Sequence, residues 1–599
     1  MLNSLMARIT FSLLFSLLLA AIAAGQARRV DDATLRNAGK SGEDWLSYGL
    51  TQGETRYSPL KQIDTTNVSR LGLAWATPLG PGGGPQEATP LVHNGVVYTV
   101  TNWSVVLAIS VTTGEQLWKW DPEQNQTAVR PKICCGVVNR GLAMYQNMVI
   151  VPVNDGRLQA LDMTTGRPVW EARVSYTQDN FTLTMAPRIA NGKVIIGVAG
   201  GDKETRGFFD AYDAKTGVRS WRFYTVPGDP SKPFENEAMK KAAETWEGEW
   251  WKLGGGAAVW DAAAYDPDAD LVYIGTGNAE PWPGSQRQKA PRDNLYVCSI
   301  LAVKVSTGEL KWYYQTTPGD EWDFDNVQHL MLADLNIGGR QRKVIMQAAK
   351  NGFYFVLDRI TGEFISAEPF ARVNWTSGYD PKTGRPNINE KARYGATPVT
   401  IFPSAGGAHS WSPMSYNPNT GLVYIPINTG GSFVFSTLPA RERGPVGPND
   451  LPMIGPEPTA DGRGALMAWD PVAQKMRWRQ PGGGGRFGGT LSTAGNLVFQ
   501  VINDGRLLAY SADKGEKLWE INTNLKDGMG PPITFTFGGK QYVAVMGGQG
   551  QVTGNNAAAN ATPPAPGIVP KLLTFVIDGT GTLPDPPPVA PPPAPAPVK

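Results

Sequence analysis

A two-strand motif that recurs along the chain restricts its fold more than any other feature. Each copy reads as a strand, a polar turn and a second strand that reaches a Trp. In five of six copies Gly stands four residues before that Trp, and Gln474 takes the Gly position in the remaining copy. The copies are LAISVTTGEQLWKW (107–120), LQALDMTTGRPVWEA (158–172), FDAYDAKTGVRSWRF (209–223), LAVKVSTGELKWYY (301–314), LMAWDPVAQKMRWRQ (466–480) and LLAYSADKGEKLWEI (507–521).

Two further segments extend this pattern. FVLDRITGEFIS (355–366) is a copy without the Trp, and LGLAWATPL (71–79) has the character of an isolated closing strand. The spacing gives roughly eight units of about 40–55 residues, which is the size of propeller blades. We therefore predict an all-β fold, an eight-bladed β-propeller over residues 28–580, in which a strand from one terminus completes a blade begun by the other. Insertions must fill the long intervals between repeats, and residues 235–251 have partly helical character.

The composition agrees with a repetitive β protein and argues against a nucleic-acid partner. The chain has 69 Gly, 49 Pro and 19 Trp, as expected for many turns and many large, flat side chains between blades. The formal net charge is only +2, and no basic tail or Lys/Arg cluster is present in the sequence. We therefore expect no binding to nucleic acid.

The terminal segments predict export. In residues 1–27, Arg8 precedes an apolar run from Phe11 to Ala24 and small residues follow, which is the pattern of a cleaved secretory signal peptide. No later stretch reaches spanning length without charges, so we expect a periplasmic protein with no stable membrane insertion. Residues 581–599 are rich in Pro and predict an extended, disordered tail.

The cysteines are few and unusually placed. The chain has three Cys, and two of them, Cys134 and Cys135, are adjacent. A bridge between neighbours would be strained, because adjacent Cα atoms lie about 3.8 Å apart, and such a small loop would stabilise little. The residues alone leave two interpretations open, a strained vicinal disulfide or two small buried thiols. Cys298 has no evident partner in the sequence, and we expect a buried free thiol there.

With its A-x-D-x-x-T-G-x-x-x-W character, the repeat resembles the tryptophan docking motif of the quinoprotein alcohol dehydrogenases, eight-bladed propellers that hold pyrroloquinoline quinone (PQQ) at the axis. The resemblance covers roughly residues 40–580. Within the family, the sequence is most similar in character to the quinohaemoprotein alcohol dehydrogenases. Motifs outside the repeat match in order: CCGVVNRG, GGGAAVWDAAAYDP, YIGTGNAEPW, YYQTTPGDEWDFD, AAKNGFYFVLDR and LSTAGNLVFQVINDGRLLAY.

The resemblance implies a PQQ site. It favours the vicinal disulfide for Cys134 and Cys135, which would lie as a plate against one face of the quinone while Trp260 forms the opposite wall. Such an arrangement fixes the orientation of the cofactor before reaction. The polar groups of PQQ would be bound by Glu87, Arg140, Thr184 and Lys350.

The resemblance also implies a hard-cation site. The three His of the chain are scattered without zinc-ligand spacing, so oxygen ligands fit better. The implied metal ligands are Asp202, where the family usually has Glu, together with Asn278 and Asp323, and either Glu204 or a water is the alternative at the first position. Asp325 resembles the additional Asp of lanthanide-dependent enzymes, and a trivalent ion needs more negative oxygen than Ca²⁺. We therefore expect a lanthanide, with Ca²⁺ as the alternative.

The implied reaction is oxidation of a primary alcohol to an aldehyde. Asp323 would act as the general base that takes the hydroxyl proton. The sequence contains no C-x-x-C-H and hence no c-type haem motif, so an external periplasmic cytochrome c is the expected electron acceptor. Two other functions stay open, a non-enzymatic periplasmic propeller scaffold and a PQQ enzyme acting on sugars or polyols.

Overall fold

The computed structural model describes residues 29–133, 136–261, 263–428, 430–443, 451–457, 464–482, 488–550 and 568–586. The expected signal peptide (1–27), the Cys134–Cys135 pair and residues 587–599 of the expected tail lie outside the described residues. Of the tail, residues 581–586 are described, and they contact the propeller: Gly581 N donates to Leu73 O at 2.7 Å, and Asn524 Nδ2 donates to Pro584 O at 2.7 Å.

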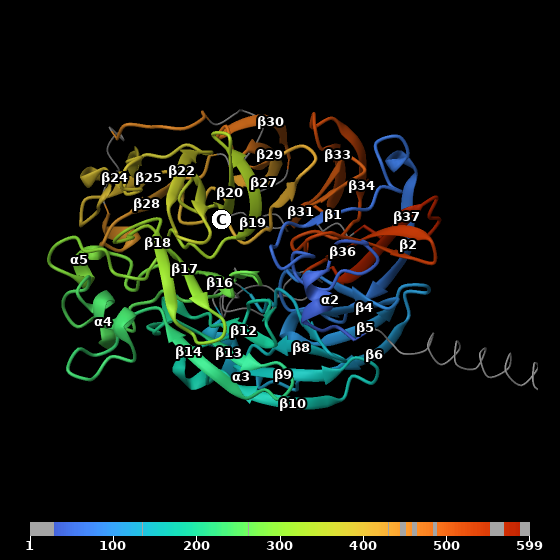
Figure 1. Ribbon diagram of the computed structural model, residues 1–599, viewed down its shortest axis with the longest axis horizontal. Helices are drawn as coiled ribbons and strands as arrows, with labels where there is room; N and C mark the ends of the chain where they lie inside the picture. Colours follow the sequence, from blue (N-terminus) through green and yellow to red (C-terminus); the bar gives the residue numbers. More distant parts are fainter. Residues whose placement is uncertain are drawn as a thin grey trace, which may run out of the picture.

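Eight antiparallel sheets stand in a ring around one axis, which confirms the predicted eight-bladed propeller (Figure 1). The first four blades, in chain order, are β3 (Leu91–His93), β4 (Val96–Val100), β5 (Val106–Ser110) and β6 (Gln116–Trp120); β7 (Ala143–Tyr145), β8 (Met148–Pro152), β9 (Arg157–Asp162) and β10 (Pro168–Arg173); β11 (Arg188–Ala190), β12 (Lys193–Gly197), β13 (Phe208–Asp213) and β14 (Arg219–Tyr224); and β15 (Ala263–Asp266), β16 (Leu271–Gly275), β17 (Ser299–Lys304) and β18 (Leu310–Gln315).

The second half of the ring repeats this meander, and its last blade takes one strand from the other end of the chain. Its blades are β19 (Met331–Ile337), β20 (Arg340–Ala348), β21 (Phe353–Asp358) and β22 (Phe364–Pro369); β26 (Ser415–Asn417), β27 (Leu422–Asn428), β29 (Gly464–Asp470) and β30 (Lys475–Pro481); β31 (Gly488–Thr493), β32 (Leu497–Ile502), β33 (Arg506–Ser511) and β34 (Lys517–Asn522); and β35 (Ile533–Phe537), β36 (Lys540–Gly547), β37 (Lys571–Ile577) and β2 (Leu71–Pro78).

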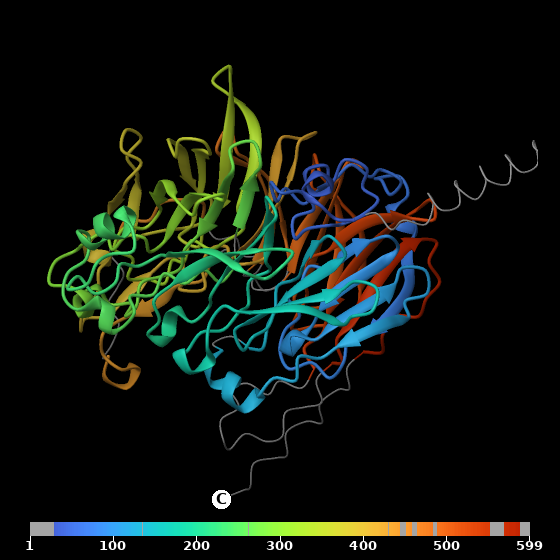
Figure 2. The same ribbon diagram turned by 60° about the horizontal axis from the view of Figure 1, so that its bottom comes forward.

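The N-terminal strand β2 closes the ring. It pairs antiparallel with β37, and the register runs from Leu71 opposite Ile577 to Pro78 opposite Lys571. In both views the blue N-terminal part of the ring lies beside the red C-terminal strands (Figures 1 and 2). The segment 71–79 is therefore the closing strand that the sequence predicted.

Most blades dock on their neighbours through a tryptophan that lies on a glycine turn. A Cβ atom placed on Gly166, for example, would lie 2.6 Å from the Trp118 ring, so no larger residue fits there without a shift. Five indoles also donate their Nε1–H to the carbonyl three residues before the glycine, at 2.9–3.2 Å. The pairs in contact are Trp75–Gly114, Trp118–Gly166, Trp170–Gly217, Trp221–Gly308, Trp312–Gly362 and Trp478–Gly515.

The two exceptions in the repeat face each other. Ser366 stands at the Trp position of the fifth blade, opposite Val356 in the β21–β22 pair, and Gln474 stands at the Gly position of the next blade. The Gln474 amide donates to Ser366 Oγ at 2.9 Å and to Pro471 O at 3.3 Å, the carbonyl that an indole would otherwise bond. Gln474 thus takes over the hydrogen bond of the missing Trp and fills part of its space.

An N-terminal segment, Gln52–Ser58, runs along the innermost strands of four successive blades. Tyr265 N donates to Gln52 O, Leu332 N to Gly53 O and Tyr416 N to Thr55 O, at 2.8–2.9 Å. Residues Tyr57–Ser58 form β1, which pairs parallel with β31. Because strands of different blades share this segment, it fills the axis beneath the loops described below.

The insertions lie at the rim of the ring. Residues 235–251 contain α4 (Glu237–Ala243), as the sequence predicted. The later insertion forms two small sheets, β23 (Thr376–Tyr379) with β24 (Pro386–Ile388) and β25 (Val399–Ile401) with β28 (Phe433–Phe435). The other α-helices are short: α2 (Asp32–Arg36), α3 (Gln126–Val129) and α5 (Gly284–Arg287). Across the described part of the chain, no helix is both long and apolar enough to cross a membrane.

The Ser366–Gln474 contact predicts a coupled pair of substitutions. Ser366→Trp alone should destabilise the protein by about 1–3 kcal/mol, because the indole overpacks against the Gln474 side chain. Ser366→Trp with Gln474→Gly should recover at least wild-type stability, because it recreates the Trp-on-Gly contact. It also places a glycine at position 474, where the backbone φ of +50° is unfavourable for glutamine. Thermal unfolding of the four proteins measures the coupling, with Gln474→Gly as control. Additive effects would contradict the compensation.

Candidate functional site

The predicted site residues occupy equivalent loops in successive blades. Glu87, Arg140, Thr184 and Trp260 each lie three or four residues before the innermost strand of their blade, that is before β3, β7, β11 and β15. Asp202, Asn278 and Lys350 lie in the loops between the second and third strands of their blades. Both kinds of loop emerge at the same end of a blade, so the ring gathers at one end of its axis residues that are far apart in sequence.

A large cavity collects these residues. It has a volume of about 510 Å³. All the predicted site residues that the structure describes line it: Glu87, Arg140, Thr184, Asp202, Trp260, Asn278, Asp323, Asp325 and Lys350. Lys132, Ile133 and Gly136, on either side of the undescribed Cys pair, line it too. Glu204, the alternative to Asp202, is exposed and is not among the lining residues.

Arg140 is the centre of one polar cluster. Its guanidinium pairs with the buried Glu87 carboxylate at 2.8 Å and donates to Thr184 Oγ1 and to Trp260 O, both at 3.1 Å. It also lies 4.8 Å from the centre of the Trp260 ring and 5.6 Å from that of Trp411. Burial raises the pKa of Glu87, and Arg140 opposes this shift. The cluster offers a fixed positive charge beside two aromatic planes, which suits a planar anion.

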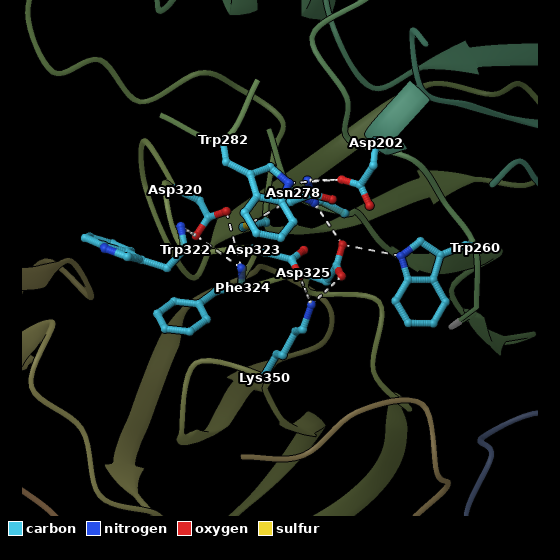
Figure 3. A network of polar contacts seen from close by, with 12 residues as sticks. Asp202, Trp260, Asn278, Trp282, Asp320, Trp322, Asp323, Phe324, Asp325 and Lys350 are labelled. Carbon is cyan, nitrogen blue, oxygen red and sulfur yellow. Dashed lines mark hydrogen bonds and ion pairs between the residues drawn. The ribbon is translucent and has the colours of Figure 1, made fainter. Parts of the chain in front are cut away.

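Lys350 is the centre of a second cluster (Figure 3). Its Nζ contacts Asp323 Oδ2 at 2.8 Å and Asp325 Oδ2 at 2.9 Å. Burial lowers the pKa of Lys350, but the two carboxylates outweigh it and the net pKa is raised. The pKa of Asp323 is well above its ordinary value, because burial and the neighbouring Asp325 and Asp202 carboxylates outweigh the opposing effect of Lys350. Asp323 therefore combines high basicity with a place on the cavity wall.

Asp325 and Asp202 are held by donors that surround the same space. Asp325 Oδ1 accepts hydrogen bonds from Asn278 N at 2.9 Å and from Trp260 Nε1 at 3.3 Å. Asp202 Oδ1 accepts from Asn278 Nδ2 at 2.9 Å and from Trp282 Nε1 at 3.0 Å. In Figure 3 the Lys350 ammonium approaches Asp323 and Asp325 from one side, and Asn278 and Asp202 lie on the opposite side of Asp325.

The polar side chains of the cavity suit both PQQ and a metal ion, the two groups that the family resemblance implied. The Trp260 indole lines the cavity, and the buried Arg140 and Lys350 are among its cationic side chains, which match a flat molecule with several carboxylates. The oxygens of Asp202, Asn278, Asp323 and Asp325 are the type that a hard cation prefers. Within the described residues, no three His, Cys, Asp or Glu side chains already form a metal cage. A bound cation would thus compete with the Lys350 ammonium for these carboxylates.

Several residues of the site were not predicted from the sequence. Trp411 and Ser410 line the cavity, although Trp411 lies outside the repeat and gave no motif. Asp261, next to Trp260, is buried beneath the cavity and was not singled out either.

Cys298, in contrast, is a buried free thiol, as predicted. The 266–270 segment is an ordinary turn, in which Asp266 accepts from the Asp268 and Ala269 amides.

Comparison with known proteins gives the family. A model of the PQQ glucose/ethanol/alcohol dehydrogenase β-propeller domain matches residues 45–368 and 462–543. The chain belongs to this family of PQQ-dependent dehydrogenases. Membership of this family explains why one ring carries both the docking tryptophans and an axial cavity. The relatives named below are dehydrogenases, which supports an enzyme and not the scaffold alternative.

Relatives with known activity resemble the chain over nearly its whole length. The quinohemoprotein alcohol dehydrogenase ADH IIB of Pseudomonas putida is 48% identical over 97% of this chain and 83% of the relative. The crystal structure of quinohemoprotein alcohol dehydrogenase from Comamonas testosteroni superposes with a TM-score of 0.83 at 44% identity, covering 94% of this chain and 85% of that one. A europium-containing methanol dehydrogenase superposes with a TM-score of 0.79 at 32% identity, covering 91% and 100%.

These relatives make the chain a PQQ-type alcohol dehydrogenase. The residues just described are the ones that can hold the cofactor and a cation in it.

Proposed function

We propose that this PQQ dehydrogenase oxidises primary alcohols to aldehydes, with Asp323 as general base and a lanthanide ion in the Asp202–Asn278–Asp323–Asp325 cluster. The observation that carries the proposal is the convergence of a basic Asp323, three further oxygen-bearing side chains and the buried cations Arg140 and Lys350 on one cavity of about 510 Å³. When bound, PQQ supplies the two-electron oxidant for the alcohol carbon and the metal ion supplies a Lewis acid.

Arg140, Glu87, Thr184 and Trp260 position the cofactor. Arg140 is already held rigid by the Glu87 carboxylate, the Thr184 hydroxyl and the Trp260 carbonyl, so binding costs little side-chain entropy. The Trp260 indole is fixed through its Nε1–H, which donates to Asp325. We infer that Cys134 and Cys135 form the facing wall as a vicinal disulfide.

Asp323 takes the hydroxyl proton of the alcohol at a carboxylate oxygen. Its raised pKa makes it a stronger proton acceptor than an exposed Asp, and its contact with Lys350 keeps a positive charge beside the ionised form. Lys350 holds its own proton firmly, because two carboxylates raise its pKa. It can therefore donate to an oxygen that becomes negative during the reaction.

The third carboxylate supports the choice of a trivalent ion. Asp325 and Asp202 add negative oxygen to Asp323, and crowded carboxylates repel one another unless a strong positive charge lies between them. The 32%-identical structure is of a europium-containing methanol dehydrogenase, which is consistent with a lanthanide here. Calcium is the alternative metal.

An external cytochrome c is the proposed electron acceptor. A relative from Thauera butanivorans, 40% identical over 91% of this chain, is named 1-butanol dehydrogenase (cytochrome c). We place the reaction in the periplasm because residues 1–27 have the pattern of an export signal.

Reconstitution with an Asp323 variant tests the proposal. The protein is loaded with PQQ and La³⁺ or Ca²⁺, and dye reduction is followed with primary alcohols, sugars and polyols. Asp323→Asn should keep the fold while kcat falls about 10²–10⁴-fold, because an amide cannot accept the proton. Asp320→Asn is the matched control, since Asp320 is buried in the same loop and accepts from the Trp322 and Phe324 amides at 3.2 Å. Near-normal turnover of Asp323→Asn would remove Asp323 as base.

Metal titration of an Asp325 variant tests the choice of ion. Asp325→Asn keeps acceptors for the Asn278 and Trp260 N–H groups but removes one negative charge. La³⁺-supported turnover should therefore fall by a much larger factor than Ca²⁺-supported turnover, and Asp202→Glu should be tolerated. Both are measured by titrating the two ions under chelator control. Equal activity of the wild type with either ion, and an indifferent Asp325→Asn, would contradict the lanthanide assignment.

A further inference from the structure

We propose that buried side chains along the propeller axis, Asp261, Tyr48, Glu54 and His329, form a water-filled proton route leading away from the cofactor cavity. The proposal rests on the proposed function for the source of the protons. Oxidation of an alcohol to an aldehyde releases two protons and two electrons per turnover, and the electrons leave to the external one-electron acceptor. The released protons need acceptors at the cavity, and the buried side chains along the axis are placed to supply them.

The route begins directly under the cofactor cavity. Asp261 follows the cavity-lining Trp260 and is only 2% exposed. It lies within electrostatic reach of Arg140 above it and of Arg188. The Arg188 guanidinium lies 4.2 Å from the centre of the Tyr48 ring and donates to Glu54 Oε1 at 2.7 Å. Tyr48 lies within electrostatic reach of Asp261, and Arg188 contacts both Tyr48 and Glu54, so these groups form one cluster next to the cavity.

The polar atoms along this line need hydrogen-bond partners that the protein does not supply. Among the described residues, none donates to or accepts from the Tyr48 hydroxyl, Asp261 Oδ1 or either ring nitrogen of His329. All three residues are 2% exposed. His329 Nε2 lies 3.7 Å from Glu54 Oε2, which is beyond hydrogen-bond distance. Buried polar groups are nearly always satisfied, and internal water molecules are the usual partners where protein atoms are missing.

A second, smaller cavity marks the far end of the line. Its volume is about 20 Å³, enough for about one water molecule. Glu54 and Arg188 line it together with Ser47 and Gln52. Ser47 Oγ and Gln52 Oε1 are further buried atoms without a partner in the described part of the chain. The unpaired atoms therefore continue from the cofactor cavity to this second cavity.

Two side chains on the route, Asp261 and His329, are suited to passing a proton from one water molecule to the next. Burial raises the pKa of Asp261 to about 7; Arg140 and Arg188 oppose the rise, and Glu87 and Glu54 add to it. Asp261 can thus both take a proton from the cavity side and release it to the next water. Burial lowers the pKa of His329 although Glu54 opposes this shift, so its ring is neutral and can accept on one nitrogen while donating from the other. Arg56, on the same segment as Glu54, also lowers the pKa of His329.

Two matched tyrosine variants test the route in the loaded enzyme. Tyr48→Phe removes only a hydroxyl without a described partner. Tyr354→Phe does the same at a tyrosine between two blades, whose hydroxyl is likewise buried and without a partner among the described residues. Tyr48→Phe should lower turnover roughly tenfold, less than loss of a general base because water can bypass the gap, and should enlarge the solvent deuterium isotope effect. Tyr354→Phe should change neither.

Two measurements on the protein without cofactor separate this proposal from the proposed function. A crystal structure should show ordered water at Tyr48 Oη, Asp261 Oδ1 and His329. Infrared titration should show a buried carboxyl that titrates near pH 7 and disappears in Asp261→Asn. A dry column, no such carboxyl, or equal effects of the two tyrosine variants would overturn the route even if the enzyme is active. Inactivity on all alcohols, with water and carboxyl present, would instead count against the proposed function alone.

Discussion

Antiparallel pairing of β2 with β37 closes the ring, and the rest of the structure depends on that closure. A single four-stranded blade exposes two apolar faces, and only a complete circle leaves every face covered by a neighbour. Closure also fixes the position of each blade around the axis. The loops that enter β3, β7, β11, β15 and β19 therefore converge at one end of the axis. Without the terminal strand, the first and last blades would part and Glu87 would lose its fixed position relative to Lys350.

The axis concentrates buried charge, and its cations Arg56, Arg140 and Lys350 each have partners within hydrogen-bond distance. Arg56 is fully buried and donates to the carbonyl oxygens of Thr490, Tyr48 and Pro532 at 2.6–2.9 Å. Arg140 pairs with Glu87, and Lys350 pairs with two aspartates. A buried charge without a partner would cost several kcal/mol of stability. The members of each cluster therefore depend on one another. A propeller that needed only stability could fill its axis with apolar side chains, whereas this one keeps charges at the cavity where we propose that the cofactor binds.

The sequence predicted the ring, its number of blades and its closing strand, because these features depend on a local repeat that is visible in one dimension. The site residues came from a family resemblance and not from the repeat, and the structure brings every described one of them to one cavity. The contact between the two residues that depart from the repeat could not be predicted from the sequence. Gln474 was visible as a departure from Gly, but its partner Ser366 lies 108 residues earlier and is paired only by the ring geometry. Asp261 and Trp411 were not predicted, because a single Asp or Trp outside a repeat has no spacing to other residues that would mark it as part of a site.

We propose that PQQ and a lanthanide ion share the axial cavity, with the ion held by Asp202, Asn278, Asp323 and Asp325. Anomalous X-ray diffraction from crystals loaded with PQQ and a lanthanide locates the ion directly. We expect one strong anomalous peak among these four side chains, next to a quinone that packs on Trp260 and contacts Arg140. A peak elsewhere, or an occupied cavity with no ion at these oxygens, would contradict it.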